Sequence, residues 1–421
     1  MRKTLAILSL GLLYSFGATA QQGAFATGKY RNLFLEAGHS QPEIRKKIDA
    51  AFQQLFHGDP NTQTVYYEVG RNEDGPLAYV SDINNKDVRS EGMSYAMMIA
   101  VQMNKKAEFD ALWNWSKTFM YISDPKHPAY GFFSWSMKTD GRPNAESPAP
   151  DGEEYWAMDL YFASARWGDG KGIYNYRAEA DRLLSFMKNR EPITGPWKTM
   201  PNRTATEGPE FSAEHKMVRF VPSMTRPDHT DPSYHLPHFY ELWARWGPAA
   251  DRPFWAAAAK VSRDFFQKAT NPKTGLAPDY ANYDGTPVTG GFNRGASNFG
   301  PDAWRTAANW SVDWSWFAAD PRERELSDRI QAFFESQGID KYVNRYTLDG
   351  NPMPNGSHST ALVATNAIAS LAATDRARAA KFVEALWNAQ IPSGQFRYYD
   401  GMWYLMGLLH CSGEYRIWTL K

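Results

Sequence analysis

Hydrophobic residues recur at helical spacing along almost the whole chain, in segments that alternate between two characters. The segment 91–103 is apolar nearly all round, whereas 106–120 carries charged residues between its apolar positions. A helix without a polar face is buried, and an amphipathic helix turns only one side inward. These two segments therefore predict a hairpin of one inner and one outer helix.

The same alternation continues along the chain. The first helix opens with a capping box at Ser40–Glu43 and runs to about Leu55, and the last, an apolar run at about 401–410, is expected to pair with it. The remaining pairs are expected at 152–167 with 176–189, 233–246 with 252–268, 302–318 with 323–337, and 359–373 with 376–388.

Twelve helices of alternating character predict an all-α fold, an (α/α)6 barrel with six inner and six outer helices. Short connections make each hairpin antiparallel, so the inner helices all start at one end of the barrel. Small β pieces are expected in the long connections at that end, from strand-like runs at Thr64–Val69, Phe132–Trp135 and Gln395–Tyr399. A functional site is expected there too.

Charge and composition narrow the choice of partners. The 46 basic and 46 acidic residues are spread along the chain, so nothing indicates binding to nucleic acid or anionic lipid. Aromatic residues make up 15% of the chain, more than a core alone requires, and aromatic rings stack well on sugar faces. A neutral substrate fits this composition.

The first twenty residues have the form of a secretory signal. A basic start precedes an apolar stretch from Leu5 to Phe16 and small residues at 18–20. The stretch is shorter than the ~20 residues that span a bilayer, and no later segment is apolar enough. We therefore expect 1–20 to be cleaved on export to the periplasm or the medium, and 21–421 to form a single domain, a monomer without a membrane span.

Acidic residues stand at the expected starts of the inner helices. Glu91, Asp151 and Asp302 lie in three such segments, and Tyr234 and His358 hold equivalent places in two others. A single carboxylate at a helix start is usually a cap. Three together favour a shared cleft, in which an acid and a carboxylate are the pair that glycoside hydrolysis requires.

The sequence leaves the protonation of Glu91 open. A helix N-terminus and the nearby Arg89 favour its anion, whereas burial and a neighbouring carboxylate such as Asp151 favour its acid form.

Five segments resemble glycoside hydrolase family 8 in order and spacing. They read SEGMSY at 90–95, PAPDGEEY at 148–155, DPSYH at 231–235, DAWR at 302–305 and RYYD at 397–400. Within this family the chain is most similar to the xylan-active branch, above all to the reducing-end xylose-releasing exo-oligoxylanases. The resemblance implies an (α/α)6 barrel and an inverting hydrolase of xylo-oligosaccharides. No cofactor or metal is expected, because the sequence has no glycine-rich phosphate loop and no redox cysteine pair.

The resemblance also implies roles for individual residues. Glu91 would be the proton donor, Asp302 the base that activates water, and Asp151 a third carboxylate that holds the distorted central sugar. Tyr234 would lie near the attacking water. Asp284, in a turn-like stretch, is the main rival for the base and ranks second.

The expected mode of attack depends on His358. In the exo-acting enzymes that this chain resembles, a histidine at this place blocks the cleft and recognises the reducing-end hydroxyl. Here Ser359–Thr360 follow it, where a proline-containing turn is expected. Internal cleavage, by an endo-β-1,4-xylanase or another β-1,4-glycanase, therefore remains an alternative.

Further substrate contacts are expected from aromatic and basic residues near the cleft. Trp135 is the best placed sugar platform, and Trp115 is as easily a core residue. The remaining candidates are Trp304, Trp314, Arg305 and Tyr398.

Two other classes of function stay open. The chain could be a polysaccharide lyase, in which Tyr234 with His235 abstracts a proton, or a glycan-binding protein without activity. A metal site at His235 and His238 is not expected, because Pro237 disrupts their helical spacing and no third ligand cluster is near.

Overall fold

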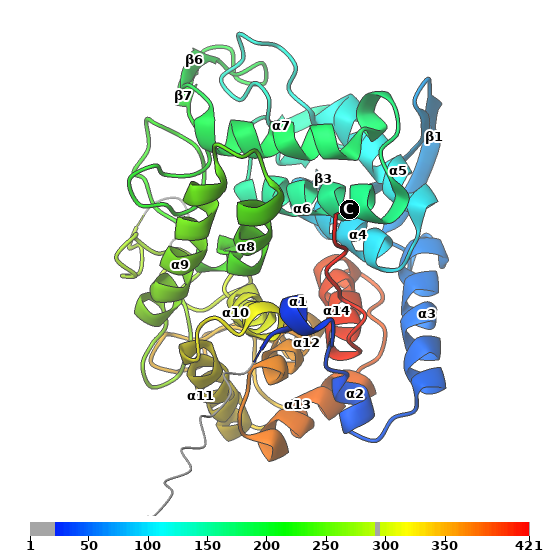
Figure 1. Cartoon of the computed structure of the whole chain (residues 1–421), viewed down its shortest axis with the longest axis vertical. Coiled ribbons are helices and arrows are strands. Elements are labelled where there is room, and N and C mark those ends of the chain that lie inside the picture. The colour runs from blue at the N-terminus through cyan, green and yellow to red at the C-terminus, as the bar shows by residue number, and fades with distance from the viewer. Residues whose placement is uncertain (1–21, 291–294, 421) are drawn as a thin grey trace, which may run out of the picture.

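Six inner helices form a closed ring in the computed structural model, which describes residues 22–290 and 295–420 (Figure 1). The expected signal segment lies outside these residues. The inner helices are α4 (Ser90–Gln102), α6 (Pro150–Trp167), α8 (Pro237–Trp246), α10 (Trp304–Phe317), α12 (Thr360–Ile368) and α14 (Arg397–Cys411).

Six outer helices surround this ring, each packed against an inner partner. They are α3 (Gln41–His57), α5 (Lys106–Trp115), α7 (Tyr176–Asn189), α9 (Arg252–Ala269), α11 (Arg322–Gln337) and α13 (Arg376–Asn388). The first of them, α3, packs on the last inner helix, α14, which in turn contacts both α12 and α4. The predicted (α/α)6 barrel is confirmed.

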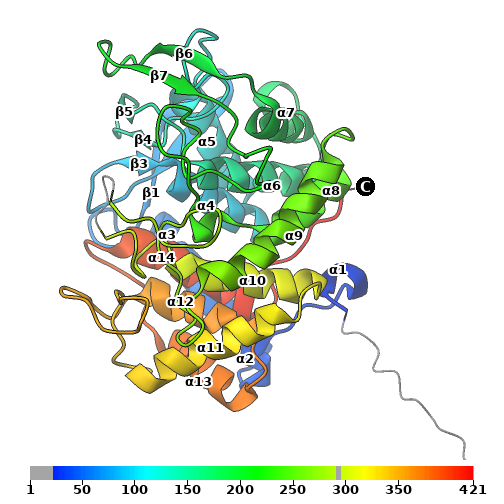
Figure 2. The same ribbon diagram turned by 90° about the vertical axis from the view of Figure 1, so that its left-hand side faces the viewer.

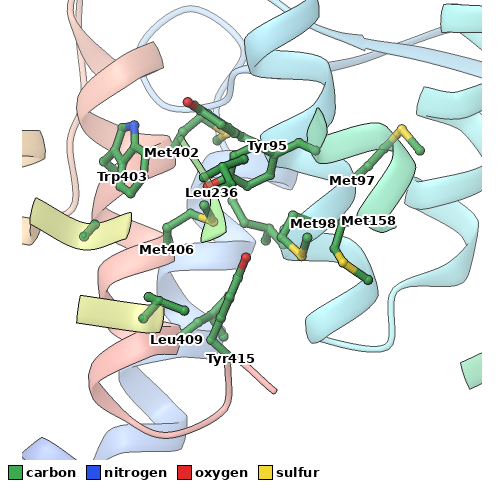
Figure 3. Packing of buried hydrophobic residues seen from close by; sticks show 14 of the residues in the cluster. Tyr95, Met97, Met98, Met158, Leu236, Met402, Trp403, Met406, Leu409 and Tyr415 are labelled. Carbon is green, nitrogen blue, oxygen red and sulfur yellow. The ribbon is translucent and has the colours of Figure 1, made fainter. Parts of the chain in front are cut away.

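Side chains fill the interior of the ring (Figure 3). Met98 of α4, Met158 of α6, and Met402 and Met406 of α14 are all 0% exposed, and the ring of Trp403 packs edge-on against Tyr95. Methionine is flexible enough to occupy the irregular space between helices. The barrel is therefore a packed core, and a ligand can approach only from its ends.

Small sheets gather on one side of the molecule, opposite the C-terminus (Figure 2). The antiparallel pairs are β1 (Tyr66–Asn72) with β2 (Gly75–Val80) and β6 (Ile193–Pro196) with β7 (Thr204–Glu207), and the three-stranded sheet is β3 (Val88–Arg89), β4 (Ser136–Met137) and β5 (Pro143–Ala145). Among the described residues, no helix is long and apolar enough to cross a membrane.

Two of the predicted strands are wrong. Residues 132–135 contain only an isolated bridge at Phe133, and the strand β4 begins after them, at Ser136. Residues 395–399 do not form a strand, because α14 already begins at Arg397. The buried Arg397 guanidinium donates hydrogen bonds to the carbonyls of Thr64 (2.8 Å) and Gly394 (2.7 Å), which fix the first turn of the helix. The helix predicted from 233 also begins later, at Pro237, after a short 3-10 turn at Pro232–Tyr234.

Candidate active site

Arg305, in the first turn of α10, joins acidic groups from four inner-helix segments. Its Nη1 donates hydrogen bonds to Glu91 Oε2 (3.0 Å) and Asp151 Oδ2 (2.8 Å). Its Nη2 lies 3.4 Å from Asp302 Oδ1 and 4.0 Å from Asp231 Oδ2. The three carboxylates singled out in the sequence therefore converge. Arg305 itself is only 2% exposed and lies beneath them, not against the sugar as expected.

Two glycines let the helix starts come this close. A Cβ atom at Gly92 would lie 2.4 Å from the ring of Tyr398, and one at Gly152 would lie 2.6 Å from Cβ of Ser90. Each glycine directly follows a site carboxylate, Glu91 or Asp151. The starts of α4, α6 and α14 can therefore meet around the carboxylates.

Tyr398 is a partner of the predicted acid. Its hydroxyl donates a hydrogen bond to Glu91 Oε1 at 3.0 Å, from a ring that is only 4% exposed. It does not line the pocket described below, so the expected direct sugar contact is replaced by a positioning role. Tyr95, which the sequence analysis did not single out, accepts a 2.7 Å hydrogen bond from Arg305 in the same cluster.

The surroundings of Glu91 favour its protonated form. Burial raises the pKa of Glu91 to about 7, and the carboxylates of Asp151 and Asp302 add to the rise while Arg305 opposes it. Burial likewise raises the pKa of Asp151. The balance that the sequence left open thus favours the acid form, because a carboxyl group with a pKa near 7 can hold a proton at neutral pH and release it during a reaction.

Asp302 is held in a different setting, just before α10, with its side chain 33% exposed. The preceding loop is fixed by Asp279, whose Oδ1 accepts hydrogen bonds from the backbone of Gly300 (3.1 Å) and Ala303 (2.9 Å). Asp279 is itself only 4% exposed. Sequence reasoning missed Asp279, which aims Asp302 at the pocket.

The rival base, Asp284, lies elsewhere. It is exposed in a turn, where its Oδ1 accepts hydrogen bonds from the backbone (2.9 Å) and hydroxyl (2.7 Å) of Thr286. It does not line the pocket with Glu91. The geometry therefore favours Asp302.

A pocket of about 390 Å³ opens above the carboxylates. Trp135 forms one wall, half-buried, with the guanidinium of Arg89 5.5 Å from its ring centre. Tyr234 belongs to the same lining. The lining residues include Arg89, Glu91, Trp135, Ser147, Pro148, Asp151, Phe220, Arg226, Tyr234, Tyr280 and Asp302.

The wall beside Tyr234 is aromatic. The ring of Phe220 lies 4.1 Å from that of Tyr280 and 5.9 Å from that of Tyr234. Both Phe220 and Tyr280 were missed in the sequence, since they lie in long connections without a periodic pattern. Together with Trp135, these rings give the pocket flat apolar faces beside its carboxyl groups, which suits a sugar chain.

Three of the tryptophans proposed as platforms are core residues. Trp115 is 1% exposed and packs against Tyr79 and Phe119, so the expectation that it binds sugar is wrong. Trp304 and Trp314, at 5% and 6% exposure, also lie outside the pocket lining.

His358 lies beside a second hollow. It is exposed before α12, and its Nδ1 lies 2.8 Å from the carbonyl oxygen of Tyr342. It lines a more open depression with Asp340, Phe396 and Asp400, and not the pocket that holds Glu91. Its expected role at the reducing end stays a prediction.

His235 cannot serve as the base of a lyase. It is 0% exposed, its two ring nitrogens lie 2.9 and 2.8 Å from the hydroxyls of Thr230 and Ser262, and burial lowers its pKa to about 3. Within the described part of the chain, no three His, Cys, Asp or Glu side chains are grouped as metal ligands.

Comparison with known proteins identifies the family of the chain. The profile of glycosyl hydrolases family 8 matches residues 72–413. The chain belongs to glycoside hydrolase family 8. Family membership makes it a glycoside hydrolase and excludes the lyase and the inactive binding protein as its class.

Members of family 8 resemble the chain over almost its full length. A reducing-end xylose-releasing exo-oligoxylanase from Paenibacillus barcinonensis is 42% identical over 94% of this chain and 99% of its own. One from Halalkalibacterium halodurans is 44% identical over 94% of this chain and 96% of its own. A crystal structure of a family 8 xylobiose complex from Teredinibacter turnerae superposes with a TM-score of 0.91. Its sequence is 55% identical, and the match covers 94% of this chain and 100% of the other.

Proposed function

We propose that this chain hydrolyses β-1,4-linked xylo-oligosaccharides with inversion and releases xylose from the reducing end. The observation that carries the proposal is the pairing of Glu91, whose pKa is raised to about 7, with the more open carboxylate of Asp302 on one pocket. One acid and one base on the same glycosidic bond are what inverting hydrolysis requires.

In this mechanism Glu91 donates its proton to the glycosidic oxygen as the bond from that oxygen to the anomeric carbon breaks. Asp302 accepts a proton from a water molecule, whose oxygen forms the new bond to the anomeric carbon from the opposite face. Arg305 stays protonated and holds the carboxylates in place. Asp151, beside Glu91 on the same guanidinium, is available to hydrogen-bond the sugar at the point of cleavage.

Release from the reducing end is supported by the curated relatives. Three reducing-end xylose-releasing exo-oligoxylanases are 39–44% identical over at least 91% of this chain, whereas the related endoglucanases are at most 30% identical over shorter stretches.

Internal cleavage is the second candidate, and two observations favour it. A 55% identical crystal structure from Teredinibacter turnerae is described as a xylanase in complex with xylohexaose. In this chain His358 lines the second hollow, so nothing in the described lining shows it closing the pocket.

Xylotetraose and its borohydride-reduced alditol, incubated in parallel, distinguish the two. Release of xylose from the free sugar and no cleavage of the alditol would support an enzyme that reads the reducing end. Cleavage of both, with xylobiose among the products, would replace that proposal with internal cleavage. Proton NMR of the first anomer formed tests inversion.

We further propose that the chain is exported and acts as a monomer. The export rests on the signal-like residues 1–20, and the monomer rests on the barrel, which closes through α3 and α14 of the same chain. N-terminal sequencing of protein from the native host and light scattering test the two parts, and an uncleaved N-terminus or a dimer would refute them.

A further inference from the structure

Two arginines line the pocket, and they differ in their partners. Arg89 lies 3.1 Å from Asp87 and 3.4 Å from Asp82, and so is neutralised within the protein. Arg226, in the connection after β7, is exposed. Among the described residues it has no hydrogen bond and no ion pair. The pocket therefore has an arginine whose charge is available to a ligand.

The carboxylates near Arg226 do not neutralise it. Asp228 lies 3.2 Å from Arg219 and accepts a 2.7 Å hydrogen bond from Tyr283. Glu207 is near enough to be influenced by the charge of Arg226, but burial raises the pKa of Glu207 to about 7, so at neutral pH it is only partly ionised.

The position of Arg226 relative to the rest of the pocket limits what it can bind. Phe220 and Tyr280 contribute aromatic faces to the lining, suited to a sugar ring, while Glu91, Asp151 and Asp302 contribute three carboxyl groups. A negative group on the sugar would be repelled by those carboxyl groups. It would be accepted at Arg226, the solvent-exposed arginine of the same lining.

We propose that Arg226 binds the carboxylate of a uronic acid substituent carried on the xylose backbone, so that acidic branched xylo-oligosaccharides are preferred substrates. The inference rests on the proposed function. A guanidinium presents paired N–H donors that match a carboxylate in a bidentate contact, and an arginine without a protein partner is ready to make it. A purely neutral substrate gives such a residue no charged partner.

The test compares pairs of ligands that differ only in charge. Xylotetraoses bearing one glucuronic acid, on each xylose in turn, are paired with their carboxyl-reduced counterparts, in which the branch becomes glucose. The ratio of kcat/KM for the charged to the neutral member is measured for the wild type, for Arg226→Gln and for Arg45→Gln. Arg45 is an exposed arginine on the outer helix α3 and serves as the control for loss of one positive charge.

We expect the wild type to favour the charged member for at least one position of the branch. Arg226→Gln should lower that ratio about 3- to 10-fold, as expected for a charged hydrogen bond near the surface, while Arg45→Gln keeps it at the wild-type value. Added salt should weaken the preference. An unchanged ratio in Arg226→Gln at every branch position would overturn the inference.

Binding separates this inference from the proposed function. Calorimetry on Glu91→Gln, and on the same variant with Arg226→Gln, gives the dissociation constants of both members of each pair without turnover. If the wild type fails to cleave unbranched xylotetraose, the proposed function falls, and the binding ratio still decides the role of Arg226. Equal affinities for charged and neutral members would refute it.

Discussion

The proton on Glu91 depends on a few neighbouring groups. Because burial and two carboxylates raise its pKa to about 7, the acid form dominates below that pH. We expect kcat/KM for xylotetraose to fall as the pH rises through about 7, since the proton donor is then lost. A pH–rate profile measures this limb directly, and a profile that is flat from pH 6 to 8 would contradict the assignment.

Tyr398 should influence the pH at which kcat/KM falls. Its hydroxyl donates to Glu91, which stabilises the anion, so Tyr398→Phe is expected to raise the pKa of Glu91 and move the basic limb to higher pH. Tyr399→Phe is the matched control, because the Tyr399 hydroxyl bonds to the carbonyl of Pro301 instead. A shift of the limb to lower pH in Tyr398→Phe would refute the positioning role.

The assignment of the base has its own test. Asp302→Ala should lower kcat by a factor of about 10² to 10⁴, the usual range for a general base, while the fold stays intact by circular dichroism. Asp284→Ala should keep nearly wild-type turnover, because Asp284 only caps a turn with Thr286. The reverse pattern would show that Asp284 is the base.

For individual residues, the sequence predicted which side chains form the site better than it predicted the hydrogen bonds between them. Glu91, Asp151 and Asp302 could be placed together because each begins an inner helix. The role of Arg305 could not be foreseen, since its bond to Glu91 joins residues 214 positions apart. Asp279 and Arg226 were missed for the same reason, because loops carry no periodicity from which a direction can be read.

Among the elements, the start of α4 is the most constrained. Gly92→Ala places a methyl group 2.4 Å from the Tyr398 ring, so either the helix or the ring must move. Overpacking of this kind costs about 1–3 kcal/mol, and we expect a lower free energy of unfolding together with loss of most activity. Urea denaturation and xylotetraose turnover measure the two effects.

Gly92→Ala combined with Tyr398→Ala checks the cause of that loss. If the clash with the ring is responsible, adding Tyr398→Ala should cost less stability in the Gly92→Ala background than in the wild type. Purely additive losses would point to another origin.

Helix periodicity was sufficient to predict the elements of the barrel, including α7 and α13 with their observed bounds. It failed where local pattern and long-range contact disagree. Residues 395–399 alternate like a strand, yet the contacts of Arg397 to the loop at Thr64 make them the start of a helix. Trp115 has the spacing of a surface helix, but β2 covers it, and Tyr79 of that strand packs on its ring.

The molecule as a whole buries many carboxyl groups. Burial raises the pKa of Glu153, Glu154, Asp159 and Glu210 well above the usual value, and raises that of Glu207 to about 7. Such groups hold protons in the folded state that the unfolded chain releases, so stability is full below a pH of about 4.5 for each group and is lost as the pH rises toward its folded pKa.

These carboxyl groups lower the melting temperature as the pH rises from about 5 to 7, whereas His235, His238 and His410, whose pKa burial lowers, act in the opposite direction. Differential scanning calorimetry across this range measures the slope. Because Glu207→Gln, outside the pocket lining, removes one titrating carboxyl group, we expect the wild type to melt progressively lower relative to this variant as the pH rises, and the opposite trend would contradict the reasoning.

The closure of the ring by α14 has a consequence for when the enzyme becomes active. Tyr398, on the last helix, contacts Glu91 across 307 positions of the chain, and α14 fills the place between α12 and α4. A growing chain on the ribosome thus carries its proton donor long before it has the helix that completes the surroundings of that donor. Activity therefore requires α14, and every product of interrupted translation that ends before this helix is expected to be inactive.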